Sequence, residues 1–194
     1  ARRGLCFPAV RMVTNGGVGL RRRQSERIAA LFPRAQVCTL YGLAECKCCA
    51  YLPPEDLHSK PGSIGIPVPD TEVWLIDEDG QDVAQPLRMG QLVIRSATVM
   101  PGYWRDPVAT AQKLKPGIEP GESVLHTGEL CSRDEDGYLY FHGAIARLVT
   151  CDGVRVNPLE VENFLHALEG VRDAAVMGIC DSRRVERLWA FVVP

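Results

Sequence analysis

The amino-acid sequence predicts an α/β fold at the N-terminal end, a β-rich middle section and a small α+β section at the C-terminal end. The first observation is a strand-like run, an amphipathic helical run and a second strand-like run in succession. The second is a frequent alternation of turn residues and short β-rich runs from residue 61 onward. The third is a capped helical run that begins at Pro158 and has strand-like runs on both sides.

The N-terminal section has the pattern of a βαβ unit. Residues 10–13 (VRMV) form a short apolar run, which residues 15–17 (NGG) interrupt. Residues 21–32 carry apolar side chains at helical spacing behind a polar first half, and Pro33 ends the run. A second strand is expected over residues 36–41. Strand, helix and strand in this order predict two parallel strands.

The middle section predicts a β-barrel subdomain or a compact β-sheet. Its turns contain Pro-Gly and Asp-Gly pairs, and a short helix is expected over residues 107–114. Asp136-Gly137 stands between two β-rich runs and predicts a hairpin. The expected strands cover residues 72–76, 91–95, 130–132 and 138–142.

The C-terminal section predicts two short strands, a helix and two further strands. The helix is expected over residues 158–168, with Asn157 as N-cap and Pro158 at its first position. The expected strands cover residues 147–150, 154–156, 171–178 and 189–193. With the two sections above, this predicts a division of the chain into residues 1–66, 67–144 and 145–194.

Composition excludes several classes of partner. The chain has 194 residues and a formal net charge of −2, which argues against a nucleic-acid surface. The one basic run, at residues 21–23, is interpreted as the solvated start of a helix. No apolar run approaches the ~20 residues that a membrane-spanning helix needs. No secretory leader is evident, and a cytoplasmic protein is expected.

The eight cysteines predict neither a disulfide framework nor a metal site. Most lie in apolar or strand-like runs, where free cysteine behaves as a small hydrophobic residue. Cys46, Cys48 and Cys49 form the only cluster, and no second pair or nearby histidine completes zinc-finger spacing. A reduced protein is therefore expected.

A series of short motifs carries the functional signal. They are YGLAE at residues 41–45, GQLVIR at 90–95, PGYW at 101–104, TGE at 127–129 and DGVRVNPLEVE at 152–162. In this order and spacing they resemble the adenylate-forming superfamily, which includes acyl-CoA synthetases, luciferases and peptide-synthetase adenylation domains. The resemblance covers nearly the whole chain. The run at residues 60–65 (KPGSIG) favours the acyl-CoA synthetase branch.

The resemblance implies that an enzyme of this kind joins a carboxylic acid to the α-phosphate of ATP and releases pyrophosphate. Tyr41 matches the aromatic residue that stacks on adenine, and Gly42 follows it in the nucleotide site. Glu45 matches the carboxylate that binds magnesium, a cation that prefers oxygen ligands. Glu129 matches the carboxylate that holds the ribose hydroxyls.

Further positions match glycines and a hinge of the family. Gly16 and Gly17 match the pair that lets the backbone approach the acyl-adenylate. Gly153 matches the glycine beside the CoA channel, and Ala146 stands at the hinge of the C-terminal lid. The implied cofactors are ATP, magnesium and coenzyme A, and the implied partner is a small carboxylic acid.

Several polar residues of the family pattern are replaced. Ala44 stands where a threonine is usual, Glu129 where an aspartate is usual, and Ala144 where an arginine is usual. Ala146 replaces the polar hinge residue and Thr150 a lysine. Arg147 could supply the missing arginine, but on a strand an offset of three would put it on the opposite face.

The resemblance places the family's phosphate loop before Ala1 and its catalytic lysine after Pro194. The chain is therefore expected to be a fragment, truncated at both ends, of an acyl-CoA synthetase-like enzyme of fatty acid metabolism. It should hold no catalytic residue and be inactive when isolated. Two alternatives stay open: a degenerate, non-catalytic module that binds a nucleotide or an acyl group, and a structural or interaction domain without a ligand.

Overall fold

The computed structural model describes residues 5–117, 119, 121–151, 153–180 and 186–194. They form two compact units. The larger comprises Ala1–Thr127 and Cys131–Phe141, and the smaller comprises Gly128–Leu130 and His142–Pro194. None of the described helices is both long and apolar enough to cross a bilayer.

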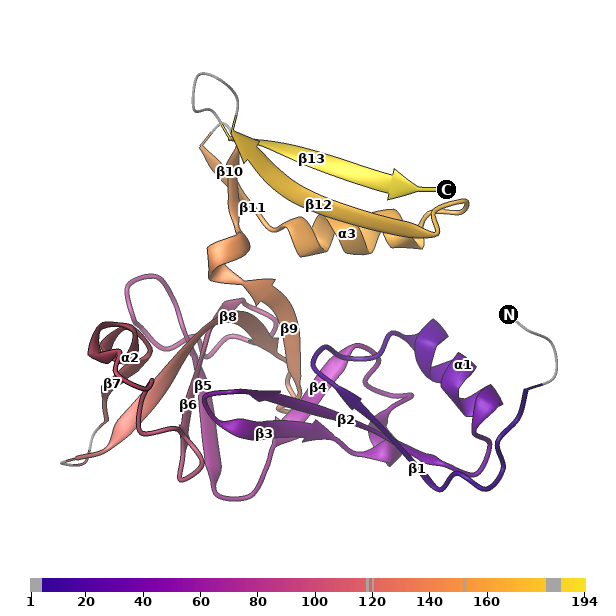
Figure 1. The fold of residues 1–194 in the computed structure, drawn as a ribbon, viewed down its shortest axis with the longest axis horizontal. Coiled ribbons are helices and arrows are strands. Elements are labelled where there is room, and N and C mark those ends of the chain that lie inside the picture. Colours follow the sequence, from indigo (N-terminus) through magenta and orange to yellow (C-terminus); the bar gives the residue numbers. More distant parts are fainter. Residues whose placement is uncertain (1–4, 118, 120, 152, 181–185) are drawn as a thin grey trace. The chain divides into compact units, whose positions relative to one another are not determined.

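The described part of the chain contains one large mixed sheet (Figure 1), with strand order β1-β2-β3-β4-β9-β8-β6-β5 and with β7 paired to β8. Its strands are β1 Met12–Gly16, β2 Gln36–Leu43, β3 Lys47–Leu52, β4 Ser63–Pro67, β5 Thr71–Ile76, β6 Gly90–Ser96, β7 Leu114–Pro116, β8 Ser123–Arg133 and β9 Leu139–Ala144.

The N-terminal βαβ unit is confirmed. Strands β1 and β2 are parallel, in a register that runs from Met12 opposite Gln36 to Gly16 opposite Leu40. Helix α1, Arg22–Leu31, connects them, and its Ile28 packs on a buried cluster that includes Val37 of β2.

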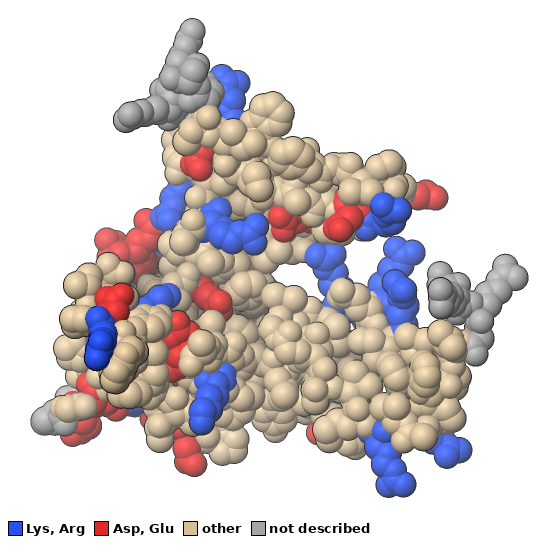
Figure 2. Space-filling view, viewed as in Figure 1, with Lys and Arg blue, Asp and Glu red and all other residues tan. Residues whose placement is uncertain are grey.

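The basic run at the start of α1 is exposed, as expected for a solvated helix start. Figure 2 shows Lys and Arg side chains at the surface near this helix.

The strand path is open, and this corrects the expected barrel. Its two ends, β1 and β5, do not pair with each other in the described residues. The reason is that β3 and β4, which the sequence analysis missed, join the parallel pair to β9. Both contacts are antiparallel pairings, of β3 with β4 and of β4 with β9. The sheet therefore continues from the βαβ unit into the β-rich section instead of closing on itself.

The main core lies on this sheet. The β6 residues Leu92 and Ile94 are fully buried in one cluster with Ile64, Leu125 and Leu139. Val93, between them, is buried on the other face of β6 in a separate cluster. Burial on both faces is typical of a central strand. Besides α1, the described residues of the larger unit include two short helices, η1 Pro54–Asp56 and α2 Pro107–Lys113.

The smaller unit contains the expected C-terminal strands and helix. They are β10 Val149–Cys151, β11 Val154–Val156, α3 Pro158–Ala167, β12 Asp173–Cys180 and β13 Glu186–Val193. A short helix, η2 Ile145–Arg147, precedes them and was not expected. Strands β10 and β11 pair antiparallel, as do β12 and β13. Asn157 caps α3 through its side-chain oxygen, which accepts from the Leu159 amide at 3.1 Å.

Candidate nucleotide and magnesium site

The β2–β3 turn carries Glu45, the expected magnesium ligand. The register of the two strands shifts between Tyr41 and Gly42, which marks a bulge. A Cβ on Gly42 would lie 1.6 Å from the carbonyl oxygen of Lys47, so this position accepts only glycine. Lys47 itself has a φ of 56°, in the left-handed region. The motif glycine therefore has a structural role in the tight turn that presents Glu45.

The Glu45 carboxylate is held by Tyr103. The phenolic hydroxyl of Tyr103 donates a hydrogen bond to Glu45 Oε1. This hydrogen bond raises the pKa of Tyr103 to about 12, so its hydroxyl stays protonated at neutral pH. The Met100 amide also donates to the Glu45 carbonyl oxygen at 2.7 Å. Tyr103 was not predicted as a site residue, although the PGYW motif that contains it was the available signal.

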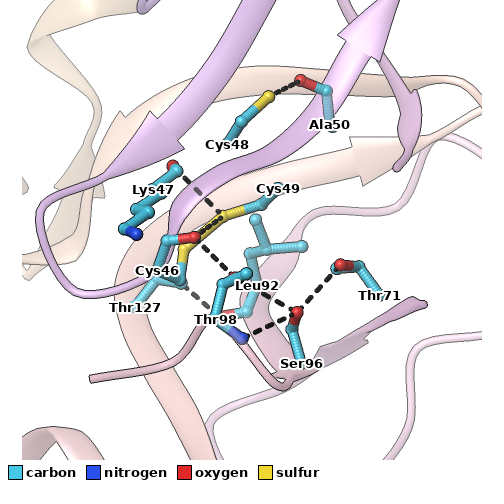
Figure 3. The surroundings of a disulfide bond; sticks show 10 residues. All are labelled: Cys46, Lys47, Cys48, Cys49, Ala50, Thr71, Leu92, Ser96, Thr98 and Thr127. Carbon is cyan, nitrogen blue, oxygen red and sulfur yellow. Dashed lines mark hydrogen bonds between the residues drawn. A yellow bond between two sulfur atoms is a disulfide. The ribbon is translucent and has the colours of Figure 1, made fainter. Parts of the chain in front are cut away.

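A disulfide joins Cys46 to Cys49 directly after Glu45 (Figure 3). This corrects the expectation of a fully reduced protein. The two Cα atoms lie 6.6 Å apart because the turn folds back, and both cysteines are buried in the main core cluster. Cys48, between them in sequence, has a half-buried free thiol that contacts the Ala50 carbonyl oxygen at 3.5 Å. The expectation that this cluster binds no zinc stays a prediction.

Tyr41, the expected adenine-stacking residue, is only 3% exposed. It belongs to the main core cluster, and its ring lies 6.4 Å from that of Phe141, centroid to centroid, at an interplanar angle of 41°. The described structure thus gives Tyr41 a packing role in the larger unit. Its contact with adenine stays a prediction.

Gly16 and Gly17 lie at the carboxyl end of β1, beside Leu40 of β2. The Gly17 amide donates to the Leu40 carbonyl oxygen at 3.1 Å. A Cβ on either glycine would meet no described atom within 4 Å, apart from its chain neighbours. The pair therefore borders open space at the end of β1, next to β2, the strand that leads to the Glu45 turn. In open α/β sheets, ligands bind at the carboxyl ends of parallel strands.

Glu129 lies on β8, in the part of that strand that belongs to the smaller unit. The strand bends at Gly128, whose φ of 75° suits glycine. On the other side of the bend, Thr127 is buried and donates through its hydroxyl to the Leu92 carbonyl oxygen at 2.7 Å. The threonine and glycine of the motif thus fix the backbone that carries the half-buried Glu129.

The hinge segment differs from expectation. Arg147 is in η2, not on a strand, so the argument from strand alternation does not apply. Its guanidinium lies 3.8 Å from Glu162 of α3, and its side chain is 63% exposed. Ala146 is exposed. Gly153 has a φ of 80° and, like Gly16, borders open space among the described atoms. Glu129, Ala146 and Gly153 all belong to the smaller unit.

The KPGSIG run has structural contacts in the described residues. Lys60 pairs with Asp134 at 2.8 Å and also with Asp136, in the turn before β9. The Ser63 hydroxyl donates to the Leu139 carbonyl oxygen at 2.8 Å. A Cβ on Gly65 would lie 1.9 Å from the Tyr51 carbonyl oxygen. This motif joins β4 to β3 and β9.

A surface pocket of about 800 Å³ on the larger unit is bounded by residues of β5, β6 and β8. Its arginine, Arg95, pairs with Glu72 and with Glu122, the latter at 3.6 Å. None of the expected site residues lines it. We therefore do not assign the nucleotide to this pocket.

Comparison with known proteins agrees with the motifs and the fold. The model of the AMP-binding enzyme family matches residues 1–104, and that of the AMP-binding enzyme C-terminal domain matches residues 160–194. The chain belongs to the AMP-binding enzyme family, which is the adenylate-forming superfamily.

Curated relatives are CoA ligases. A long-chain-fatty-acid–CoA ligase of Salmonella typhimurium is 33% identical over 189 residues, which cover 97% of this chain and 32% of the relative. A 4-coumarate–CoA ligase-like protein of Oryza sativa is 36% identical over 180 residues, which cover 92% of this chain and 29% of the relative. The chain thus spans about a third of the length of these proteins.

Solved structures of the superfamily share the fold. The O-succinylbenzoate CoA synthetase of Bacillus subtilis, in complex with ATP and magnesium, has a TM-score of 0.79 and 27% identity. The match covers 98% of this chain and 38% of that one. The amide bond synthetase McbA of Marinactinospora thermotolerans has a TM-score of 0.77 and 31% identity, with coverages of 94% and 36%.

Proposed function

We propose that the chain is part of an ATP-dependent ligase that activates a carboxylic acid as acyl-AMP and transfers the acyl group to CoA. The observation that supports this best is the pairing of two features at the carboxyl ends of β1 and β2. Gly16 and Gly17, at the end of β1, border open space, and Glu45 lies in the turn that follows β2, the parallel neighbour of β1. Glycine backbone lets a phosphate ester approach closely, and a carboxylate suits the cation that accompanies the phosphate.

Each site residue has a proposed role that follows from the chemistry of its side chain. Glu45 would hold the magnesium ion, which neutralises phosphate charge, while Tyr103 keeps the Glu45 carboxylate oriented. Tyr41 and Gly42 would contact the nucleotide base, and Glu129 would accept hydrogen bonds from the ribose hydroxyls. Positioned groups of this kind act mainly by orienting the reactants and stabilising developing charge.

In the smaller unit, Gly153 would border the CoA channel and Ala146 would be the pivot of the lid. We retain the division into residues 1–66, 67–144 and 145–194 as part of this proposal. We propose a fatty or aryl acid as substrate, because the relatives described above are named for long-chain fatty acids and coumarate. The proposed compartment is the cytoplasm, which supplies ATP and CoA.

The test is ATP–pyrophosphate exchange, driven by fatty and aryl acids, with the product of the full open reading frame that encodes this chain. Glu45→Gln should lower the exchange rate at least about tenfold, because it removes a charged ligand. Glu26→Gln, an exposed change on α1, is the matched control and should have no effect. Wild-type protein without exchange or ATP binding would contradict the proposal.

A second candidate function is a non-catalytic module that binds a nucleotide or an acyl group. It is favoured by Ala144 and Ala146, which replace the polar groups expected near the ribose and at the hinge. Calorimetry distinguishes the two functions: ATP binding without pyrophosphate exchange, with every acid tested, would support the binding module.

A further inference from the structure

The disulfide between Cys46 and Cys49 lies at the β2–β3 turn, next to Glu45, the proposed magnesium ligand. The turn contacts the segment after β6 through two backbone groups. The Glu45 carbonyl oxygen accepts from the Met100 amide at 2.7 Å. The Cys46 carbonyl oxygen accepts from the Thr98 hydroxyl at 2.9 Å, as Figure 3 shows. The disulfide then ties Cys46 to β3. Glu45 is thus held by its own carbonyl group, and the residue after it is held by both a hydrogen bond and the disulfide.

This disulfide restrains a short stretch of chain. Its two cysteines are three residues apart in sequence, so it closes a very small loop. A disulfide acts by restricting the loop that it closes, and the global effect is smaller for shorter loops. The residues that it does restrain include Lys47, which has a left-handed backbone. The bond therefore acts on the shape of the Glu45 turn more than on the stability of the whole sheet.

We propose that Cys46 and Cys49 are a reversible redox pair that sets the conformation of the Glu45 turn. The inference rests on the proposed function for its consequence: an ordered turn binds magnesium and ATP more tightly than a loosened one, because the carboxylate is pre-positioned. In a compartment that supplies ATP and CoA, protein disulfides are usually transient or redox-sensing. A reversible redox role therefore suits this disulfide better than a permanent structural role.

The exchange reaction uses a low-molecular-weight thiol as reductant. A thiolate attacks one sulfur of the pair, a mixed disulfide forms, and the other cysteine leaves as a thiolate. A second thiol resolves the mixed disulfide. In total two thiols are oxidised to one disulfide, and Cys46 and Cys49 each gain one electron and one proton. Both cysteines are buried, at 0% and 2% exposure, so the attack requires a local opening of the turn.

The first measurement establishes the pair. Protein equilibrated in glutathione buffers is denatured, alkylated and analysed by mass spectrometry. The oxidised form should show six reactive thiols out of eight, with the bond located between Cys46 and Cys49. Cys48→Ser is the matched control and should retain the bond. Alkylation of Cys46 and Cys49 throughout the oxidising range would overturn the proposal.

The second measurement tests the conformational effect by amide hydrogen exchange. Reduction should speed exchange about fivefold or more at Cys46 and Met100, which lie in the attached segments, and leave α1 unchanged. A double variant, Cys46→Ser with Cys49→Ser, should behave as the reduced form in every buffer. If that variant does not fold, reduced Cys48→Ser protein gives the same comparison. Equal exchange in both redox states would overturn the proposal.

Magnesium–ATP calorimetry on the same samples separates this inference from the proposed function. Reduction should weaken binding about threefold or more, as expected when a pre-positioned group is loosened. Faster amide hydrogen exchange on reduction, without ATP binding in either state, would support the redox pair and contradict the proposed function. If the oxidised and reduced proteins bind ATP equally and show the same amide hydrogen exchange, the redox pair is overturned and the proposed function still stands.

Discussion

The hydroxyl of Tyr103 donates a hydrogen bond to the carboxylate of Glu45, which lies 58 residues earlier in the chain. The bond joins the PGYW motif to the YGLAE motif. Two sequence signals that are separate along the chain therefore form one structural feature. It fixes one oxygen of the carboxylate and directs the group from the tip of the β2–β3 turn.

The Tyr103–Glu45 bond should be visible in a spectrophotometric titration of tyrosine. The Glu45 hydrogen bond raises the pKa of Tyr103 to about 12, above the ~10 of a free tyrosine. Its stabilising effect is thus present below pH ~10 and lost as the pH rises through ~12. Glu45→Gln should move the Tyr103 transition back toward 10. In Tyr103→Phe, one late transition should be lost, whereas that of Tyr138 should remain, because Asp56 raises the pKa of Tyr138 to about 12. Burial also raises the pKa of Tyr140, so this tyrosine should titrate late in both proteins.

Acid should destabilise the larger unit through Asp134. Burial tends to raise the pKa of this carboxyl, but hydrogen bonds from Lys60, the Tyr138 amide and the Tyr140 hydroxyl outweigh it, and the pKa is lowered. The stabilising effect is therefore present above the unfolded pKa of ~3.9 and lost as the pH falls through the folded value.

The measurement is thermal unfolding as a function of pH. Asp134→Asn should lower the midpoint at neutral pH by about 3 °C or more and flatten its dependence below pH ~5. Asp136→Asn is the matched control: its side chain is 70% exposed, so its pair with Lys60 should contribute little. A wild-type acid profile in Asp134→Asn would contradict the assignment.

Asn157 should stabilise the start of α3. Its side-chain oxygen accepts from the Leu159 amide, and its side-chain nitrogen donates to the His142 carbonyl oxygen. Asn157→Ala removes both bonds and should cost about 1 kcal/mol or more of local stability, the usual cost of losing an N-cap. Asn157→Asp keeps the cap but loses the donor, so its cost should be smaller. Hydrogen exchange in α3 measures both, and equal protection in all three proteins would refute the role.

The sequence predicted elements whose signals are local. The parallel β1–β2 pair follows from apolar runs around an amphipathic helix, and the α3 cap follows from Asn157-Pro158. The Asp136-Gly137 hairpin was also found, with Gly137 at a φ of 89°. Strand β4 was missed because Ser63–Pro67 contains glycine and proline, so it resembles a turn. What makes it a strand is a partner far away: the Ser63 hydroxyl bonds the Leu139 carbonyl oxygen, 76 residues later.

The residue types of the site stay a prediction from the sequence, whereas their supporting contacts could not be predicted from it. Glu45 and the two glycines carry family motifs, and the structure places them on neighbouring strand ends. The disulfide was missed because two cysteines three residues apart approach only when the chain reverses between them, here at Lys47. Tyr103 was missed for the same reason as β4, since nothing local indicates which carboxylate it contacts.

The replaced ribose and hinge residues should limit nucleotide binding. Ala144 offers no charged donors, whereas an arginine presents several in a fixed fork. Arg147 is a poor substitute, because its guanidinium faces Glu162 at 3.8 Å. Ala144→Arg combined with Glu129→Asp should tighten ATP binding by about 1–3 kcal/mol, the scale of one or two charged hydrogen bonds. The measurement is calorimetry on the product of the full open reading frame.

Two further variants define what this result means. Arg147→Ala is the control and should leave ATP affinity unchanged, because the Arg147 side chain is largely exposed and directed to α3. Ala146→Asp, added to the double variant, should be needed before turnover rises, since nucleotide binding and lid motion are separate steps. Loss of affinity in Arg147→Ala, with no gain in the double variant, would show that Arg147 already supplies the missing charge. ATP binding with the same affinity in every variant would show that these positions do not contact the nucleotide.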